Sequence, residues 1–158
     1  MAACSGTTII TDYSERAQAG AARNLLIFMD GTSNDLNSVT NVSRLHAFAK
    51  NQNRQDLAIF YTSGVGADGT GIIGMGSGLG IGRDVRSAYR FLAETYRDGA
   101  DIAHLYGYSR GAYAARILAG FLYTVGLVDI AQRPDGQGGW QTHSGAERDA
   151  LIAELYRA

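Results

Sequence analysis

A serine between two glycines is the pattern in this sequence with the clearest chemical meaning. Gly107-Tyr108-Ser109-Arg110-Gly111 reads G-x-S-x-G, the spacing of a nucleophilic serine held at a sharp turn between a strand and a helix. Gly107 and Gly111 would leave room for that turn, and the turn would aim the backbone amide of Arg110 at a developing oxyanion. The pattern predicts attack by Ser109 on an ester carbonyl. Taken alone, it also fits a serine that caps an ordinary helix.

Such a serine needs a histidine base and a carboxylate that orients the histidine. In hydrolases with this turn, the acid and then the histidine follow the serine along the chain. After Ser109 the sequence has a single histidine, His143, preceded by Asp129 and Asp135. A local triad of Ser109, Asp129 or Asp135, and His143 respects that order. The alternative is that His143 is a solvent-facing residue of a glycine-rich loop, with no sheet to fix it.

The other histidines have structural explanations. His104 lies five residues before Ser109, in an apolar run typical of a strand. We expect its ring to bond to a neighbour in the sheet, because it does not lie at the carboxyl end of that strand. His46 is expected to pack on the face of a helix. Arg110 could meet an anionic substrate group or form an ion pair over its helix.

Alternating apolar segments predict the elements that would position these residues. Short apolar runs predict strands over residues 24–29, 57–62 and 101–106. Apolar residues at helical spacing predict helices over residues 41–50, 83–97, 111–124 and 144–156. This alternation indicates a parallel sheet with helices on its faces. Residues 1–22 show no clear period, and we expect a flexible lead-in there.

A glycine-rich stretch separates the second predicted strand from its helix. Residues 64–82 contain nine of the 21 glycines, which weaken regular structure, so we expect a loop or a flap. Gly64-Val-Gly-Ala-Asp-Gly69 also matches the G-x-G-x-x-G dinucleotide fingerprint. That fingerprint requires a helix to open at once, whereas further glycines follow here. Nucleotide binding is therefore a weaker hypothesis than hydrolysis.

Composition limits the possible partners and cofactors. The chain has 158 residues and a formal net charge of −1, which provides no general attraction for nucleic acid. Cys4 is the single cysteine, so an intramolecular disulfide or a cysteine-rich zinc site cannot form. We expect no metal and no cofactor. The start of the chain lacks an apolar run of signal-peptide length, and no apolar run is long enough for a transmembrane helix. A cytoplasmic location is the default expectation.

Several segments together resemble one protein family. They are Phe28-Met-Asp-Gly-Thr32, Thr40-Asn-Val-Ser-Arg-Leu45, Gly64-Val-Gly66 and Tyr106-Gly-Tyr-Ser-Arg-Gly-Ala-Tyr-Ala-Ala-Arg-Ile-Leu-Ala-Gly120. Their order and spacing resemble the uncharacterised α/β-hydrolase domain family that includes the first class of type VI secretion lipase effectors, phospholipases delivered between bacteria. The similarity runs from about residue 24 to residue 128.

This resemblance implies a fold, a substrate class and further site residues. It implies that Ser109 is the nucleophile, that the substrate is an ester or a phospholipid, and that specialised secretion is possible. It suggests that Gly31 or Thr32 lends a backbone amide to the oxyanion hole beside Arg110. In the family, the acid and the histidine follow further strands later in the chain, and we find no such strands here. We therefore expect a three-layer α/β-hydrolase-like core over residues 23–158, with a mostly parallel sheet that lacks its C-terminal strands.

Two functions are consistent with these observations. The first is a serine ester hydrolase of the lipase or phospholipase type, active if the missing acid and histidine are supplied. The alternative is a truncated or degenerate hydrolase domain that acts as a fragment or an interaction module. Its uncovered sheet edge and apolar face would favour self-association or a partner that covers that edge.

Overall fold

A mixed sheet forms the centre of the protein. The computed structural model describes residues 9–13, 22–31, 39–63, 79–97, 100–134 and 140–157. Its strands are β1 (Ile9–Tyr13), β2 (Asn24–Met29), β3 (Leu57–Thr62), β4 (Ile102–Gly107), β5 (Gln132–Pro134) and β6 (Trp140–Thr142). Its helices are α1 (Asn41–Asn51), α3 (Leu79–Thr95), α4 (Arg110–Val125) and α5 (Gly145–Leu155).

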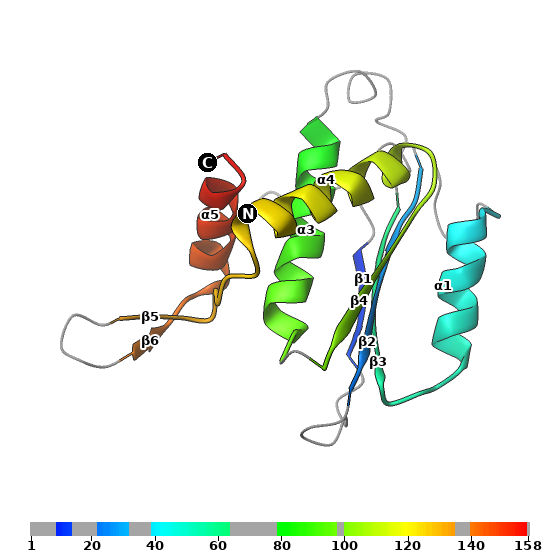
Figure 1. Cartoon of the computed structure of the whole chain (residues 1–158), viewed down its shortest axis with the longest axis horizontal. Helices are drawn as coiled ribbons and strands as arrows, with labels where there is room; N and C mark the ends of the chain where they lie inside the picture. The colour runs from blue at the N-terminus through cyan, green and yellow to red at the C-terminus, as the bar shows by residue number, and fades with distance from the viewer. Residues whose placement is uncertain are drawn as a thin grey trace.

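The main sheet has the strand order β1-β3-β2-β4. Strand β2 pairs in parallel with β3 on one side and with β4 on the other, while β1 is antiparallel to β3. Helix α1 covers one face of this sheet, and α3 and α4 cover the opposite face (Figure 1). These three layers confirm the predicted α/β class with a mostly parallel sheet. No described helix is long and apolar enough to cross a lipid bilayer.

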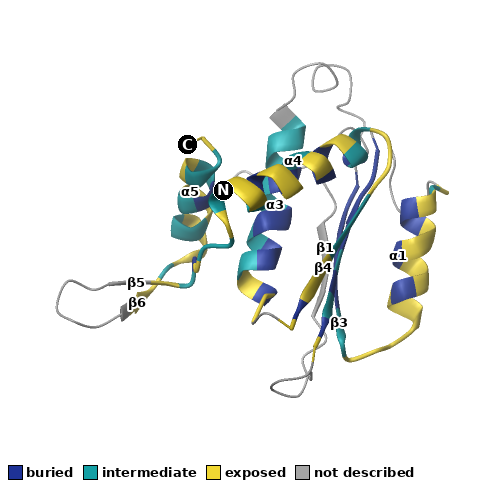
Figure 2. Ribbon diagram, in the orientation of Figure 1, coloured by how far each residue is buried: buried dark blue, intermediate teal, exposed yellow. Residues whose placement is uncertain are grey.

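Strand β2 is apolar on both faces because both faces are covered. Leu25, Ile27 and Met29 belong to the larger core beneath α3 and α4. Phe28 faces the smaller core, which it shares with α1. Burial of each such side chain stabilises the fold by about 1.5–3 kcal/mol. Figure 2 shows the resulting pattern, with the buried residues along the strands and on the inner sides of the helices.

At the amino ends of the strands, a buried ion pair joins β2 to β4. The Nε atom of Arg23 donates to Oδ1 of Asp101 at 3.1 Å, and Nη2 donates to Oδ2 at 2.5 Å. The same Nη2 also donates to the backbone oxygen of Thr95, at the end of α3. Burial alone would raise the pKa of Asp101, but the hydrogen bonds from Arg23 and from the Arg97 backbone, with the charge of Arg23, hold it below its ordinary value.

Three elements differ from the sequence expectations. Part of the expected flexible lead-in, Ile9–Tyr13, forms strand β1; residues 1–8 and 14–21 lie outside the described residues. Helix α3 begins at Leu79 and not at Arg83, so it includes the last glycines of the glycine-rich stretch, whose residues 64–78 lie outside the described residues. The glycines in its first turn each cost about 1 kcal/mol, and the buried face further along the helix offsets that cost. The expected turn after residue 132 is flanked by the short hairpin strands β5 and β6.

The last helix packs outside the three layers. Ser144 caps α5 by accepting a hydrogen bond from the backbone of Glu147, whose side chain accepts one in return from the Ser144 backbone. Helix α5 contacts the outer side of α3 (Figure 1). It runs antiparallel to α3, because Gly145 lies beside Arg90 while Tyr156 lies beside Gly82.

Candidate active site

The connections between strands bring two strand ends together at one edge of the sheet. The chain leaves β2 through α1 to reach β3 on one side, and returns through α3 to reach β4 on the other side of β2. In open parallel sheets, ligands bind outside the carboxyl ends of the strands at such a switch point. Met29 is the register partner of Gly107, and the Tyr108 amide donates to the Met29 carbonyl at 3.1 Å. Ser109 therefore lies beside the loop that follows β2.

Ser109 has a strained backbone in a turn and not inside a regular element. Its φ is 52° and its ψ is −122°, a sparsely populated region that costs about 1–3 kcal/mol for a residue with a side chain. Its side chain is exposed. Although Ser109 occupies the N-cap position of α4, its hydroxyl makes no capping hydrogen bond within the described part of the chain. The alternative of a serine that simply caps a helix is therefore not supported.

Both glycines of the motif allow close approach of backbone segments. A Cβ atom on Gly107 would lie 2.5 Å from the Cα atom of Ala112. A Cβ atom on Gly111 would overlap the carbonyl of Met29 and lie 2.6 Å from the carbonyl oxygen of Asp30. The missing side chains thus let α4 begin directly against the ends of β4 and β2. The amino end of α4, with its partial positive charge, starts at the residue after Ser109.

The loop after β2 is held by a buried carboxylate that sequence reasoning did not single out. Asp30 is 2% exposed, and its Oδ2 accepts hydrogen bonds from the hydroxyls of Thr40 at 2.7 Å and Tyr61 at 3.1 Å. Thr40 also caps α1 by accepting a hydrogen bond from the Ser43 backbone. Asp30 therefore joins β2, β3 and α1 beside Ser109.

This arrangement changes the expected role of Gly31. Its backbone amide donates to Oδ1 of the adjacent Asp30 at 2.8 Å, so a role in an oxyanion hole would require it to share or exchange this hydrogen bond. Thr32, the other expected donor from this loop, lies outside the described residues. The Arg110 amide is the expected oxyanion donor whose position at the start of α4 fits the role.

A second buried acid lies under the turn. Burial raises the pKa of Asp84 to about 6, and the charges of Arg83 and Arg110 limit the rise. The hydroxyl of Thr62, at the end of β3, donates to Asp84 at 3.4 Å. The charge of Arg110 therefore acts on Asp84. The sequence offered no clear signal for Asp84, because an acid among arginines is typical of an exposed helix turn.

The structure does not assemble the local triad. Helix α4 has 16 residues and is therefore about 24 Å long. Ser109 lies at its start, whereas Asp129 and His143 lie beyond its end, as Figure 1 shows for the two termini of α4. The His143 ring is half-buried, with Nδ1 3.0 Å from the carbonyl oxygen of Ile130. Asp129 accepts a hydrogen bond from the Ala131 backbone, and Asp135 lies outside the described residues.

The remaining histidines have the structural roles expected of them. Nε2 of His104 lies 2.9 Å from Oδ1 of Asn24 across the sheet. His46 is buried on α1, and its ring stacks on Tyr61 with centroids 4.7 Å apart. All three histidines of the chain are described, and none forms a hydrogen bond with Ser109. In the part of the chain that the structure describes, no three His, Cys, Asp or Glu side chains gather as a metal site.

The chain is similar to a family model and to a curated protein. Residues 23–152 match the family model described as "T6SS, Phospholipase effector Tle1-like, catalytic domain". A curated relative, "Uncharacterized protein YEL023C" of Saccharomyces cerevisiae, is 24% identical over 157 residues. That match covers 88% of this chain and 23% of the yeast protein, so the chain spans about a quarter of the length of this relative. No solved structure matches.

Proposed function

The chain belongs to the family of Tle1-like catalytic domains of type VI secretion phospholipase effectors, and from this we propose that it is a serine ester hydrolase with Ser109 as its nucleophile. The observation that supports this most is the strained, exposed serine between β4 and α4, at the switch point of the sheet. Ligands of open parallel sheets bind at such a switch point, and a hydroxyl held there at a cost in backbone strain without a helix-cap hydrogen bond supports this role.

The proposed reaction proceeds through an acyl-enzyme. The Oγ atom of Ser109 attacks the ester carbonyl carbon while its proton passes to a base. The negative oxygen of the tetrahedral intermediate accepts a hydrogen bond from the Arg110 amide, supported by the amino end of α4. The C–O bond then breaks, the alcohol leaves with the proton, and water hydrolyses the acyl-serine by the same steps. The family indicates a phospholipid as the substrate.

The base is the missing part of this mechanism. Because all three histidines lie away from Ser109, we propose that the base and its acid come from outside these 158 residues. The length of the yeast relative, of which the match covers 23%, is consistent with further segments of that kind. We expect the chain to turn over esters slowly by itself, since the oxyanion donor and binding alone retain part of the catalysis.

An exogenous base tests this proposal. Imidazole added at neutral pH should accelerate the acylation of Ser109 by an activated ester or a fluorophosphonate probe, and mass spectrometry should locate the modification at residue 109. Ser109→Ala should abolish the modification. Ser144→Ala is the matched control, because Ser144 also occupies an N-cap position but its hydroxyl accepts the capping hydrogen bond. Modification elsewhere, or equal modification of Ser109→Ala, would refute the nucleophile.

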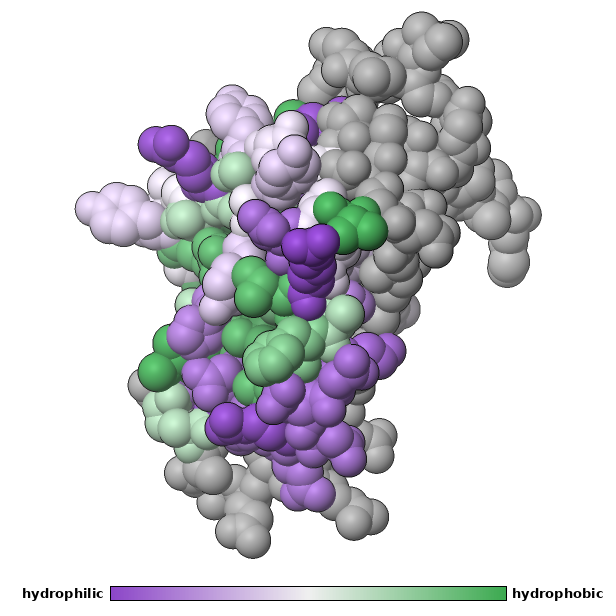
Figure 3. Space-filling model, turned by 90° about the vertical axis from the view of Figure 1, so that its right-hand side faces the viewer, coloured by the Kyte–Doolittle hydropathy of each residue, from purple (hydrophilic) through white to green (hydrophobic). Residues whose placement is uncertain are grey.

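A second candidate function is an interaction module without catalysis of its own. Two observations favour it: no histidine lies near Ser109, and β4 is an edge strand of the described sheet, with Ile102 and Ala103 exposed. The α1 side of the molecule also exposes the apolar residues Val39, Leu45 and Phe48, and Figure 3 shows apolar and polar side chains mixed on this side. Concentration-dependent sedimentation together with an unreactive Ser109 would support this function over hydrolysis.

A further inference from the structure

The outer side of α4 differs in composition from its packed side. Small and apolar residues of α4 are buried against α3 and the sheet. The exposed residues on the opposite side of the helix are Tyr113, Arg116, Ala119, Gly120, Tyr123 and Thr124. We call this surface the tyrosine face. Figure 2 shows exposed residues along the side of α4 that faces the viewer.

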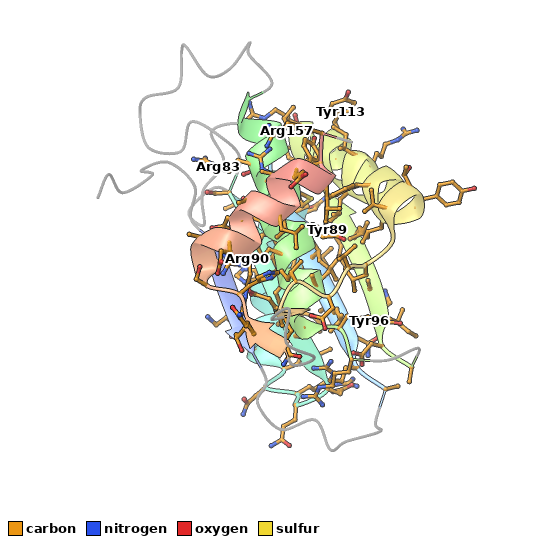
Figure 4. All side chains as sticks on the ribbon, turned by 90° about the vertical axis from the view of Figure 1, so that its left-hand side faces the viewer. Arg83, Tyr89, Arg90, Tyr96, Tyr113 and Arg157 are labelled. Carbon is orange, nitrogen blue, oxygen red and sulfur yellow. The ribbon has the colours of Figure 1, made fainter. Side chains whose placement is uncertain are left out.

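The tyrosine face begins one helical turn after Ser109. Tyr113, Arg116, Gly120 and Tyr123 follow at i, i+3, i+7 and i+10, which places them on one side of the helix. Tyr113 is 59% exposed and Tyr123 is 93% exposed, and a Cβ atom on Gly120 would meet nothing within 4 Å. The Tyr113 side chain, labelled in Figure 4, extends away from the body of the protein. A surface held against this face would therefore lie beside the exposed serine.

The segment that forms this face contains no acidic residue. Residues 102–128 include Arg110 and Arg116 but no aspartate and no glutamate. The charge of Arg110 acts on the buried Asp84, so Arg116 is the cation that the face presents. Arg116 is exposed, and no carboxylate among the described residues forms an ion pair with it. The face is locally positive, although the whole chain has a net charge of −1.

This composition suits the boundary between lipid and water. A tyrosine has an apolar ring and a polar tip, and such side chains are enriched where a membrane meets water. A guanidinium group binds phosphate oxygens with charge-assisted hydrogen bonds. Tyrosine and arginine also occur in protein interfaces, and the position of the face decides between the two partners. A bilayer held against this face brings ester groups to the side of the molecule that carries Ser109.

We propose that the tyrosine face docks the protein on the surface of a bilayer that contains anionic phospholipids. The tyrosine rings enter the head-group region, and Arg116 binds a lipid phosphate. This inference rests on the proposed hydrolase function, for which it supplies the means of bringing a lipid substrate to Ser109. Docking raises the effective concentration of lipid esters at the turn without any new contact to the reacting groups.

Binding of the whole chain to vesicles tests this proposal without relying on hydrolysis. The wild type should float with phosphatidylcholine vesicles that contain phosphatidylglycerol, and more weakly with phosphatidylcholine alone. Tyr113→Ser combined with Tyr123→Ser should weaken binding to the anionic vesicles by at least about tenfold, because two rings lose their apolar contact. Arg116→Gln should weaken it by about fivefold, as expected for one cation near an anionic surface. Arg116→Lys keeps the charge and should restore most of the binding.

The matched control lies on α1, which covers the other face of the sheet (Figure 1). Phe48 is 65% exposed and Arg44 is also exposed. Phe48→Ser combined with Arg44→Gln therefore removes an aromatic ring and a positive charge far from the tyrosine face. This variant should bind vesicles as the wild type does. Equal weakening by the control and by the double tyrosine variant would overturn the proposal.

A fluorescent label on α4 locates the contact without removing any tyrosine. Gly120→Cys in a Cys4→Ser background provides one thiol for an environment-sensitive dye, at a position where a side chain has room. The emission should shift to the blue when anionic vesicles are added, because the dye moves from water into the head-group region. The same dye on Ala47→Cys, at an exposed position of α1, should show no shift. An unchanged emission at position 120 would overturn the proposal.

Acylation of Ser109 by a soluble fluorophosphonate separates this inference from the proposed function. The double tyrosine variant should be acylated at the wild-type rate while it loses vesicle binding. Acylation of the wild type without vesicle binding would overturn the docking face alone. Tyrosine-dependent vesicle binding by a chain whose Ser109 does not react would support the docking face and refute the hydrolase. Self-association that the tyrosine substitutions abolish, without vesicle binding, would overturn the proposal in favour of an interface between copies.

Discussion

The two ends of the parallel sheet contrast in their contribution to stability. At the amino ends of β2 and β4, the buried Arg23–Asp101 pair satisfies its charges with several hydrogen bonds. At the carboxyl ends, Ser109 adopts a strained backbone and Asp84 is buried with a raised pKa. The comparison indicates that a satisfied ion pair stabilises the amino ends of the strands, whereas the carboxyl ends carry a strained turn and a buried acid. The predictions below test this difference from the largest effect to the smallest.

Breaking the amino-end pair should have the largest effect. Arg23→Ala leaves Asp101 buried without its partner and should lower the free energy of unfolding by about 3–5 kcal/mol, measured by urea denaturation. The stabilisation by Asp101 is present above its ordinary pKa of 3.8 and is lost as the pH falls through its lower folded pKa.

The matched control for that prediction is an exposed pair. Arg54 and Asp56 form an ion pair on the surface, so Arg54→Ala should change the stability little. Replacing both Arg23 and Asp101 with apolar residues should be less damaging than Arg23→Ala. Equal losses of stability for Arg23→Ala and Arg54→Ala would contradict the proposed stabilisation of the amino ends by the buried pair.

Adding a methyl group at Gly111, in the turn beside Ser109, should cause the next largest loss of stability. Gly111→Ala forces a Cβ atom against the carbonyl of Met29 and should lower the free energy of unfolding by up to about 3 kcal/mol. Gly120→Ala in the same helix meets nothing within 4 Å and should raise it by about 0.5–1 kcal/mol. Thermal unfolding of both variants checks the opposite signs, and a shared sign would refute the close approach of α4 to β2.

Neutralising the buried acid of the carboxyl end should stabilise the protein. Because burial raises the pKa of Asp84 from 3.8 to about 6, its ionised form is disfavoured in the folded state. Asp84 therefore lowers the free energy of unfolding increasingly as the pH rises from about 3.8 to about 6. Asp84→Asn should raise the free energy of unfolding by about 3 kcal/mol near pH 7.5 and by almost nothing near pH 3.5. Glu154→Gln, at an exposed position, is the control for the removal of one negative charge, and a gain from Asp84→Asn that is equal at both pH values would contradict the burial effect.

Relief of the Ser109 strain should give the smallest effect. Ser109→Gly removes the side chain from a backbone with φ of 52° and should raise the free energy of unfolding by about 1 kcal/mol, because the added freedom of the unfolded chain offsets part of the relief. Ser109→Ala keeps the strain and should leave stability unchanged. Chemical denaturation of the two variants checks this, and a loss of stability in Ser109→Gly would show that the turn is not strained.

Local patterns predicted most of the fold and one part of the site. The apolar runs located β2, β3 and β4 to within about a residue because these strands are buried or paired along their length. The glycine spacing located the turn at Ser109. Strand β1 could not be predicted, because its antiparallel pairing with β3 depends on a distant neighbour. The sequence pattern predicts the start of α3 four residues too late, because glycine has a low helix propensity. The helix nevertheless includes these glycines, since its stability comes from packing.

The electrostatic part of the site could not be predicted from spacing. Asp30 and Asp84 are 54 residues apart in sequence, and both become important because the fold buries them at neighbouring strand ends. Burial and its effect on ionisation are properties of the packed molecule. The same reasoning explains the local triad: the order of Ser109, Asp129 and His143 was suitable, but the length of α4 separates them.

The pairing of β4 with β2 has a consequence for the order of folding. Arg23 and Asp101, at the start of the two strands, are 78 residues apart, so their pairing closes a long loop at a substantial entropic cost. The bend at residue 109 depends on β4 lying beside β2. It should therefore form late, with low φ-values for mutations near Gly111 and higher ones in the local β2-α1-β3 unit. The reactive geometry would then be absent from partly folded chains, including those emerging from the ribosome.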